Sequence, residues 1–227
     1  MKVYGYNSVS EALKAKKVNK IYVAKEGDLK IRNLISEAKS KGIPVYTVEN
    51  LPGKIAADVS MITYSKVDEI MKKALENNGF ILILDNVTDQ RNLGACIRTA
   101  EFFGASGVLI PKRRAAQVNE GAVKTSAGAV FHVDIAREEN LVSAIKKLKK
   151  YGFYIVAADL DGERLDLVNF SFPLALVVGG EDRGISHHIK KRCDSIVRIP
   201  GSGRIESLNL SVAAGILMYE IAKKLNR

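Results

Sequence analysis

The sequence predicts an α/β fold built around a parallel sheet. Residues 80–84 and 174–178 are continuous apolar runs, as is typical of strands that are buried on both faces of such a sheet. Between runs of this kind lie segments with apolar residues at helical spacing, for example residues 141–150. Alternation of the two patterns along the chain favours strands that are connected by crossover helices.

Composition and charge narrow the class of protein. The 227 residues have a net charge of +10, which favours nucleic acid over a membrane surface as partner. A basic surface that serves only solubility is the competing interpretation. No apolar run approaches the roughly 20 residues that span a bilayer, and the N-terminal sequence lacks a signal-peptide core. The two cysteines, Cys96 and Cys193, lack metal-ligand spacing. We therefore expect a cytoplasmic protein without membrane contact or bound metal.

Residues 1–66 predict a small, basic α/β domain that suits binding better than catalysis. Its expected helices run from Asn7 or Ser8 to Leu13 and over 29–40, and its expected strands cover 20–24 and 43–48. Residues 49–65 are expected to form loops and short turns. An amphipathic helix over 66–75 is expected to lie in a linker at 67–78.

Residues 79–227 predict a larger domain of regular β/α pattern. The expected strands are 80–84, 107–110, 130–134, 153–157, 174–178 and 195–199. The expected helices are 93–103 with Asn92 as N-cap, 141–150, 185–191, and a last helix that Ser207 caps. Asp159 and Asp161 precede Gly162, so we expect them in a turn.

Three loops that each follow an apolar strand carry the unusual residues: 85–94, 179–184 and 200–209. Open α/β sheets bind ligands at the carboxyl ends of their strands, so these loops predict a site. Gly179 and Gly180 permit close backbone approach. Arg98 lies roughly 140° from Leu93 around its helix and points away from the buried stripe. The chain lacks the glycine-rich motifs of nicotinamide and nucleoside-triphosphate sites.

The cluster at 112–114, Lys-Arg-Arg, directly follows the expected strand at 107–110. This place at a strand end makes it a candidate for facing phosphate groups. A solvated basic loop is the competing interpretation.

These loops carry three motifs that resemble those of the SpoU class of RNA ribose 2′-O-methyltransferases. They read Asp85-Asn-Val with Asn92-Leu-Gly and Ile97-Arg-Thr-Ala100, then Val178-Gly-Gly-Glu181-x-x-Gly184, then Ile199-Pro-Gly-Ser-Gly with Ser207-Leu-Asn-Leu-Ser211. Gly201 departs from the family pattern, in which a bulky residue follows Ile-Pro. The stretch at 5–13 is similar to the small ribosomal-protein-like RNA-binding domain that precedes this catalytic domain in the ribosomal-RNA guanosine branch.

The resemblance implies a C-terminal α/β knot, a homodimer with active sites near the subunit interface, and S-adenosylmethionine as cofactor. By the same resemblance, the catalytic residues are Arg98, Asn92, Glu181, Ser207 and Asn209. The residues that hold the cofactor are Gly179, Gly180, Ile199, Ser207 and Leu208. RNA contacts are expected from Arg91, Lys112, Arg113 and Arg114.

The resemblance further implies a guanosine of 23S ribosomal RNA as substrate. One alternative is a transfer-RNA guanosine methylase, although that branch usually lacks the separate N-terminal domain. The other is a non-enzymatic factor that binds ribosomal RNA. Such a factor has little use for Asn92, Arg98, Glu181 and Asn209 together at one sheet edge.

Overall fold

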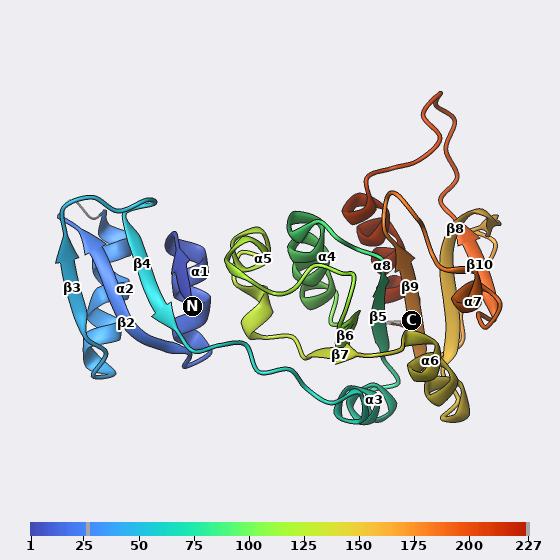
Figure 1. Ribbon diagram of the computed structural model, residues 1–227, viewed down its shortest axis with the longest axis horizontal. Coiled ribbons are helices and arrows are strands. Elements are labelled where there is room, and N and C mark those ends of the chain that lie inside the picture. Colours follow the sequence, from blue (N-terminus) through green and yellow to red (C-terminus); the bar gives the residue numbers. More distant parts are fainter. Residues whose placement is uncertain (26–27, 226–227) are drawn as a thin grey trace.

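The computed structural model describes residues 1–25 and 28–225, which form two sheets with their own helices (Figure 1). The first sheet has the strand order β1-β4-β2-β3, in which β4 is antiparallel to both neighbours and β2 is parallel to β3. The elements of this domain are β1 (Lys2–Tyr4), α1 (Tyr6–Lys14), β2 (Val18–Ala24), α2 (Leu29–Ser40), β3 (Val45–Val48) and β4 (Ile55–Val59).

The second sheet has six strands in the order β10-β8-β9-β5-β6-β7, and every neighbouring pair is parallel. Its elements are α3 (Val67–Glu76), β5 (Phe80–Asp85), α4 (Gln90–Phe102), β6 (Gly107–Pro111), α5 (Glu120–Thr125), η1 (Ala129–Phe131), β7 (Ile135–Glu138), α6 (Leu141–Lys150), β8 (Tyr154–Arg164), β9 (Leu174–Gly179), α7 (His187–Lys190), β10 (Ser195–Arg198) and α8 (Leu210–Leu225). Because the strands are parallel, their carboxyl ends meet at one edge of the sheet. This confirms the predicted α/β class with a parallel sheet, whereas the predicted knot stays a prediction.

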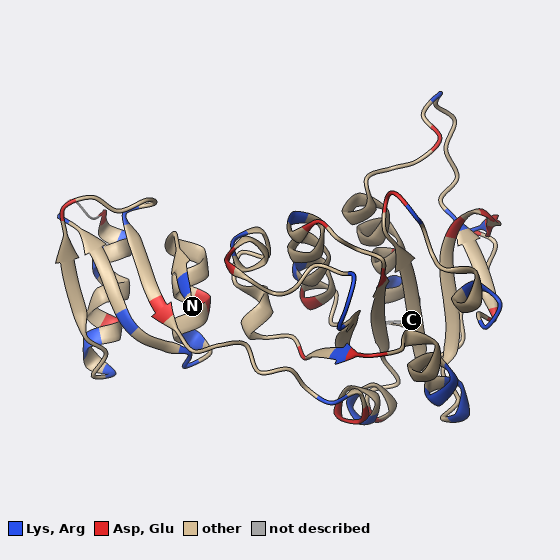
Figure 2. Ribbon diagram, viewed as in Figure 1, with Lys and Arg blue, Asp and Glu red and all other residues tan. Residues whose placement is uncertain are grey.

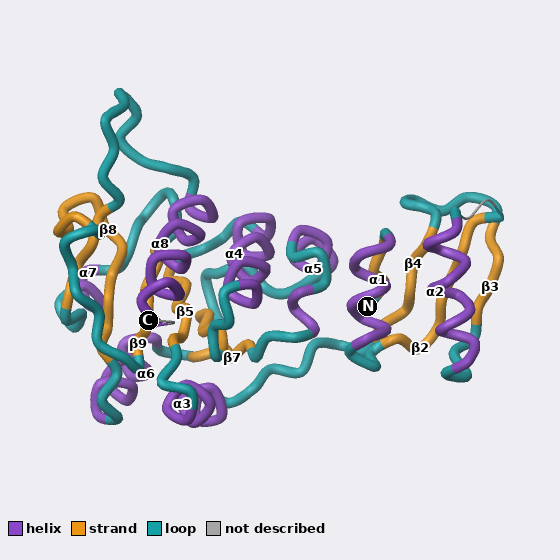
Figure 3. Tube along the Cα trace, turned by 180° about the vertical axis from the view of Figure 1, so that it is seen from behind, coloured by secondary structure: helices purple, strands orange, loops and turns teal. Residues whose placement is uncertain are grey.

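Helices cover both faces of the second sheet. Along β5, Leu82 faces a core that includes side chains of α4 and α8, while Ile81 and Ile83 face a core that includes side chains of α3, α6 and α7. All three side chains are fully buried. Helix α8 lies behind the sheet in Figure 1 and in front of it in Figure 3. Within the described residues, no helix is long and apolar enough to cross a membrane.

The two domains touch through α1 and the segment that follows α5, which includes η1. Glu11 on α1 lies within hydrogen-bond distance of His132, with 2.8 Å between Oε2 and Nε2. Beside it, a Cβ added at Gly128 would lie 2.6 Å from the Cβ of Glu11, so the two backbones approach closely there. Helix α3 buries Ile70 and Met71 against the second sheet. The division at residue 66, with a linker at 67–78, stays a prediction.

Three predicted elements were wrong. Residues 49–65 contain strand β4, whose adjacent alanines Ala56 and Ala57 have low strand propensity. The strand expected at 130–134 is instead the short helix η1, which follows the left-handed Gly128, and pairing with β6 begins only at Ile135. The turn expected at Asp159–Gly162 is part of β8.

Gly162 is the reason that β8 continues. A Cβ at this position would lie 2.6 Å from the backbone of Val197, so glycine allows β10 to approach across an irregular pairing.

Two helix starts were also misplaced. Helix α4 begins at Gln90, and Asp89, not Asn92, is its N-cap. Helix α8 begins at Leu210, and Asn209 Oδ1 accepts the backbone N–H of Ser211 at 3.0 Å, so Ser207 is not the cap. In α4 the earlier Asp89 takes the capping role, and in α8 the later Asn209 takes it. Sequence spacing alone does not show which of several capping residues is used.

Leu82→Ala should lower the free energy of unfolding by about 2–5 kcal/mol, because it leaves a cavity between β5 and the helices. Urea denaturation followed by circular dichroism measures this. Leu167→Ala is the matched control, since Leu167 is 63% exposed and should change stability by less than about 0.5 kcal/mol. Equal stability of the two variants would contradict the packing described here.

Candidate active site

The loops that follow β5 and β9 are fastened together at the carboxyl edge of the second sheet. Gly180 donates its N–H to the Asp85 carbonyl at 2.8 Å, and Asp85 Oδ2 accepts the N–H of Ser186 at 2.8 Å. Asn86 Nδ2 donates to the Gly184 carbonyl at 3.3 Å. A Cβ at Gly180 would lie 2.1 Å from the Asn86 carbonyl oxygen, so only glycine fits. The sequence motifs include Asp85 and Asn86, but their role as fasteners was not predicted.

Gly179 is similarly constrained. A Cβ there would lie 2.2 Å from the carbonyl carbon of Gly184 and 2.3 Å from the nitrogen of Ile185. The close backbone approach predicted for these glycines is therefore an approach to the chain's own loop. Their role in holding a cofactor stays a prediction.

Three of the five predicted catalytic residues meet in one hydrogen-bonded cluster. Asn209 Nδ2 donates to Glu181 Oε1 at 2.7 Å and to Asn92 Oδ1 at 3.2 Å. Glu181 Oε1 also accepts the N–H of Leu210 at 3.3 Å, at the start of α8. Each member comes from a different one of the three predicted loops or the helix that the loop opens. The cluster is open to solvent, so an incoming ligand can reach it.

Arg98 lies elsewhere on α4. It lines a cavity of about 440 Å³ between α4 and helix α1 of the first domain, together with Asn7, Glu11, Ser126 and His132. At 1.5 Å of rise per residue, Arg98 stands roughly 9 Å along the helix from Asn92. The structure thus places the arginine beside the first domain rather than in the cluster of Asn92, Glu181 and Asn209.

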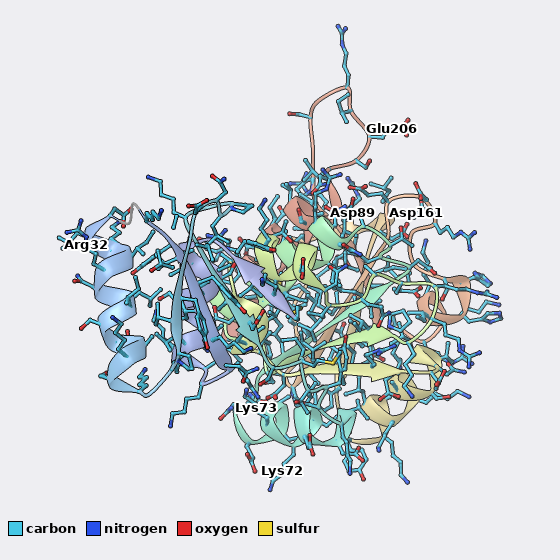
Figure 4. The ribbon with its side chains drawn as sticks, turned by 60° about the vertical axis from the view of Figure 1, so that its left-hand side comes forward. Arg32, Lys72, Lys73, Asp89, Asp161 and Glu206 are labelled. Carbon is cyan, nitrogen blue, oxygen red and sulfur yellow. The ribbon has the colours of Figure 1, made fainter. Side chains whose placement is uncertain are left out.

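Ser207 and Leu208 belong to a segment, residues 200–208, that extends away from the body of the protein. Figure 1 shows it as the long excursion between β10 and α8, and Figure 4 shows Glu206 on it, outside the body of the protein that carries Asp89. Within the described chain, its peptide groups form no backbone hydrogen bonds. Ile205 is 84% exposed, Leu208 is 48% exposed, and Ile199 at its base is half-buried.

Free peptide groups beside apolar side chains suit a ligand with an aromatic ring system and polar ring atoms. An adenosine moiety has both features. The residues present in segment 200–208 therefore fit the cofactor that the sequence predicts.

The predicted RNA-contacting residues are exposed, and three of them have acidic partners. Arg91 pairs with Asp89 at 3.4 Å, while Lys112 and Arg113 pair with Glu139 at 3.1 and 3.8 Å. The basic stretch 112–114 directly follows β6, where Figure 2 shows a blue segment. Exposed ion pairs of this kind contribute little stability and exchange easily for a phosphate. The Lys112 ammonium holds the pKa of the Glu139 carboxyl below its ordinary value.

The thiols do not serve as nucleophiles at neutral pH. Burial raises the pKa of Cys96 to about 12, and burial beside Asp194 raises that of Cys193 to about 12. Among the described residues, no three His, Cys, Asp or Glu side chains are grouped so as to hold a metal ion.

Comparison with known proteins identifies the family of the chain. The profile of the SpoU rRNA Methylase family matches residues 79–219, which is more than half of the chain. The chain belongs to the SpoU rRNA methylase family. A second profile, described as RNA 2′-O ribose methyltransferase substrate binding, matches residues 2–50. The chain is therefore a SpoU methyltransferase that carries a substrate-binding domain.

Individual relatives of this SpoU methyltransferase align with most or nearly all of the chain. An uncharacterized tRNA/rRNA methyltransferase of Archaeoglobus fulgidus is 55% identical over 224 residues, which is 99% of each chain. The structure of an AdoMet-bound rRNA methyltransferase of Sinorhizobium meliloti has a TM-score of 0.79 at 25% identity and covers 98% of this chain and 86% of that chain. The TrmH/SpoU tRNA-modifying enzyme of A. aeolicus has a TM-score of 0.58 at 30% identity and covers 70% and 84%.

The stability of this SpoU methyltransferase should depend on pH through Asp89. The N–H groups of Asn92 and Arg91 hold the pKa of Asp89 below its ordinary value of 3.8. Because the folded-state pKa is the lower one, the stabilisation is complete above the unfolded pKa and is lost as pH falls through the folded pKa. An NMR titration of the Asp89 carboxyl should show the lowered midpoint.

Two variants separate the cap from its charge. Asp89→Asn keeps an acceptor at the N-cap but has no charge to titrate, so its melting temperature should change less with pH in the acid range than that of the wild type. Asp89→Ala loses the acceptor and should melt at a lower temperature than the wild type at neutral pH. A titration midpoint at the value of an unstructured peptide would show that Asp89 does not cap α4.

Proposed function

We propose that this protein transfers a methyl group from S-adenosylmethionine to the ribose 2′-hydroxyl of a guanosine in 23S ribosomal RNA, in the cytoplasm. The observation that carries the proposal is the hydrogen-bonded cluster of Asn92, Glu181 and Asn209, which belongs to the three family motifs. S-adenosylmethionine, when bound, supplies a methyl group that its sulfonium already activates. The protein then has to position the hydroxyl in line and assist loss of its proton.

The cofactor is held at the carboxyl edge of the second sheet by Gly179, Gly180, Ile199, Ser207 and Leu208. The free peptide groups of segment 200–208 bind its polar atoms, and the exposed Leu208 packs against its ring. The Asn209–Glu181 bond fixes the start of α8, so the segment is anchored at that end. None of these five cofactor-binding residues has a charged side chain.

Arg98 grips the phosphate next to the target ribose and stabilises the alkoxide that develops on the 2′-oxygen. A guanidinium group stays protonated in proteins and is therefore a poor base. The proton leaves through a phosphate oxygen, Glu181 or water. Glu181 Oε1 accepts two N–H groups, and the amide oxygen of a glutamine can accept the same two. The Glu181→Gln variant therefore keeps these bonds but removes the carboxylate, so it tests whether Glu181 accepts the proton.

The first domain favours ribosomal RNA over transfer RNA as substrate. It matches the substrate-binding profile over residues 2–50, and the A. aeolicus tRNA-modifying enzyme aligns with only 70% of this chain. Arg91, Lys112, Arg113 and Arg114 supply further contacts to phosphate groups. A transfer-RNA guanosine enzyme is the nearer alternative, and an RNA-binding factor without catalysis is the more distant one.

Exposed apolar side chains support a homodimer. Phe102 on α4 is 77% exposed, and Tyr219 on α8 is 52% exposed. Phe103 connects them, with ring centroids 5.1 Å from Phe102 and 6.1 Å from Tyr219. An aromatic patch of this kind on two adjacent helices is suited to burial against a second copy.

Incubation with labelled S-adenosylmethionine and, separately, 23S, 16S and transfer RNA should label one guanosine ribose of the 23S RNA. Cleavage that is blocked by ribose methylation maps the position. Label on transfer RNA would keep the chemistry and overturn the substrate. Silence on every RNA, together with no cofactor binding by calorimetry, would favour the RNA-binding factor.

Arg98→Ala should lower kcat for methylation by roughly 10²–10³-fold, because a donor to the developing oxyanion is lost. Arg98→Lys keeps the charge but loses the two-pronged geometry, so most of the loss should persist. Arg192→Ala is the control, because Arg192 lies between α7 and the start of β10, away from the carboxyl ends of the strands. Substantial methylation by Arg98→Lys would rule out the two-pronged grip.

Phe102→Glu should convert the dimer to a monomer, because it places a charge in the aromatic patch. Light scattering behind a sizing column measures the mass. Leu29→Glu changes a similarly exposed side chain, 72% against 77%, in the other domain and should leave the dimer intact. A wild-type protein of monomer mass would contradict the proposed homodimer.

A further inference from the structure

The first sheet has an open face that the proposed chemistry does not use. The side chains that point to α1 and α2 are Val3, Ile21, Val23, Ile55, Ala57 and Val59, all of which are buried. The residues that alternate with these along each strand lie on the opposite face of the sheet. Helix α2 lies behind the strands in Figure 1 and in front of them in Figure 3, so the viewer of Figure 1 faces the open side.

This open face carries a row of aromatic rings. The strand register aligns Tyr4 with Ala56, Ala56 with Tyr22, and Tyr22 with Tyr46, so the row crosses all four strands. The rings of Tyr22 and Tyr46 are stacked, with centroids 5.9 Å apart and planes inclined by 29°. Tyr46 is 50% exposed, although it lies in a strand.

A second row of charged residues lies beside the first. The register places Lys2 opposite Asp58 and Asp58 opposite Lys20. Lys2 Nζ stands 4.3 Å from the centroid of the Tyr22 ring, and Lys20 is exposed. We call Tyr4, Tyr22 and Tyr46, with Lys2, Lys20 and Asp58, the tyrosine face.

The tyrosine face is held in place before any ligand arrives. The Tyr22 hydroxyl donates to Asp58 Oδ2 at 2.8 Å, and this bond raises the pKa of the phenol above its ordinary value. Tyr22 therefore stays a protonated donor at neutral pH, and Asp58 fixes the direction of its ring. The acidic group of the face is thus engaged with Tyr22, which leaves the lysines to set the charge that a ligand meets.

We propose that the tyrosine face binds an unpaired base of the substrate RNA by stacking on Tyr46, whose ring lies on the edge strand β3 and is backed by Tyr22. Aromatic side chains on an open sheet present flat surfaces to successive bases, and nearby lysines attract the phosphates between them. A base pair within a helix presents no free face to such a surface, so the ligand is a single-stranded segment. The inference rests on the proposed function insofar as it takes RNA as the substrate.

Two features favour RNA over a protein partner at this face. Lys2 and Lys20 flank the rings, which suits a polyanion, whereas the core of a protein interface is depleted of lysine. The domain also matches the substrate-binding profile of RNA ribose methyltransferases over residues 2–50, which include five of the six residues of the face. Stacking there would hold a loop of RNA while its target ribose reaches the second domain.

The test measures binding of a fluorescein-labelled, unpaired oligoadenylate strand to the full chain by anisotropy. Tyr46→Ala should weaken the affinity roughly tenfold, which is within the range for loss of one stacked base. Tyr46→Phe should restore it, because the ring is kept. Tyr151→Ala is the matched control, since Tyr151 is 54% exposed on the second domain. The same strand paired with oligouridylate should bind more weakly than the single strand.

Wild-type affinity of Tyr46→Ala, or a preference for the duplex, would overturn the inference. Calorimetry with S-adenosylmethionine separates this result from the fate of the proposed function, because Tyr46→Ala should bind the cofactor like the wild type. If the protein methylates 23S RNA but Tyr46→Ala binds the strand normally, the inference fails and the function stands. If no RNA is methylated but Tyr46→Ala loses the strand, the inference stands and the function fails.

Discussion

Close contact between backbones at the end of β9 is the constraint on which the candidate site depends. Gly180 lies against the Asn86 carbonyl, and Gly179 lies against the Gly184–Ile185 peptide, with no room for a side chain at either position. This contact brings the loop after β9 against the loop after β5. Glu181 then stands one residue beyond the contact, where it reaches Asn209. A side chain at either glycine would separate the loops and disperse the cluster.

The fold of the second domain was largely predictable because its central strands, such as β5 and β9, are apolar on both faces. A continuous apolar run such as 80–84 cannot be an exposed element. The helices between such runs have apolar residues at the usual helical spacing. The three loops were predictable as a site since polar residues repeatedly follow such strands. Strand β4 was not, because its alanines carry little propensity and it forms through pairing with β1 and β2 on either side.

The sequence pattern picked out Asn92, Glu181 and Asn209, which the structure brings together, but it did not predict the geometry of their cluster. Sequence spacing does not reveal which oxygen caps α4 or α8, so Asp89 and Asn209 were identified only from their hydrogen bonds. It also does not reveal that Arg98 faces α1, since this depends on how the two domains pack. The tyrosine face could have been found: Tyr22 and Tyr46 lie in strands whose apolar partners alternate with them, but the register that aligns the rings is a tertiary property.

The seam between the domains has a consequence for how RNA specificity can be changed. Residues 60–66 join the two domains covalently, which suggests a simple site for exchanging one substrate-binding domain for another. However, Glu11 reaches across to His132, and α1 packs against a position where only glycine fits. A grafted domain has to supply an acidic residue that reaches His132 and a helix that packs closely against Gly128. The recognition domain is therefore not an independent module, and new specificities are more accessible by altering its surface than by replacing it.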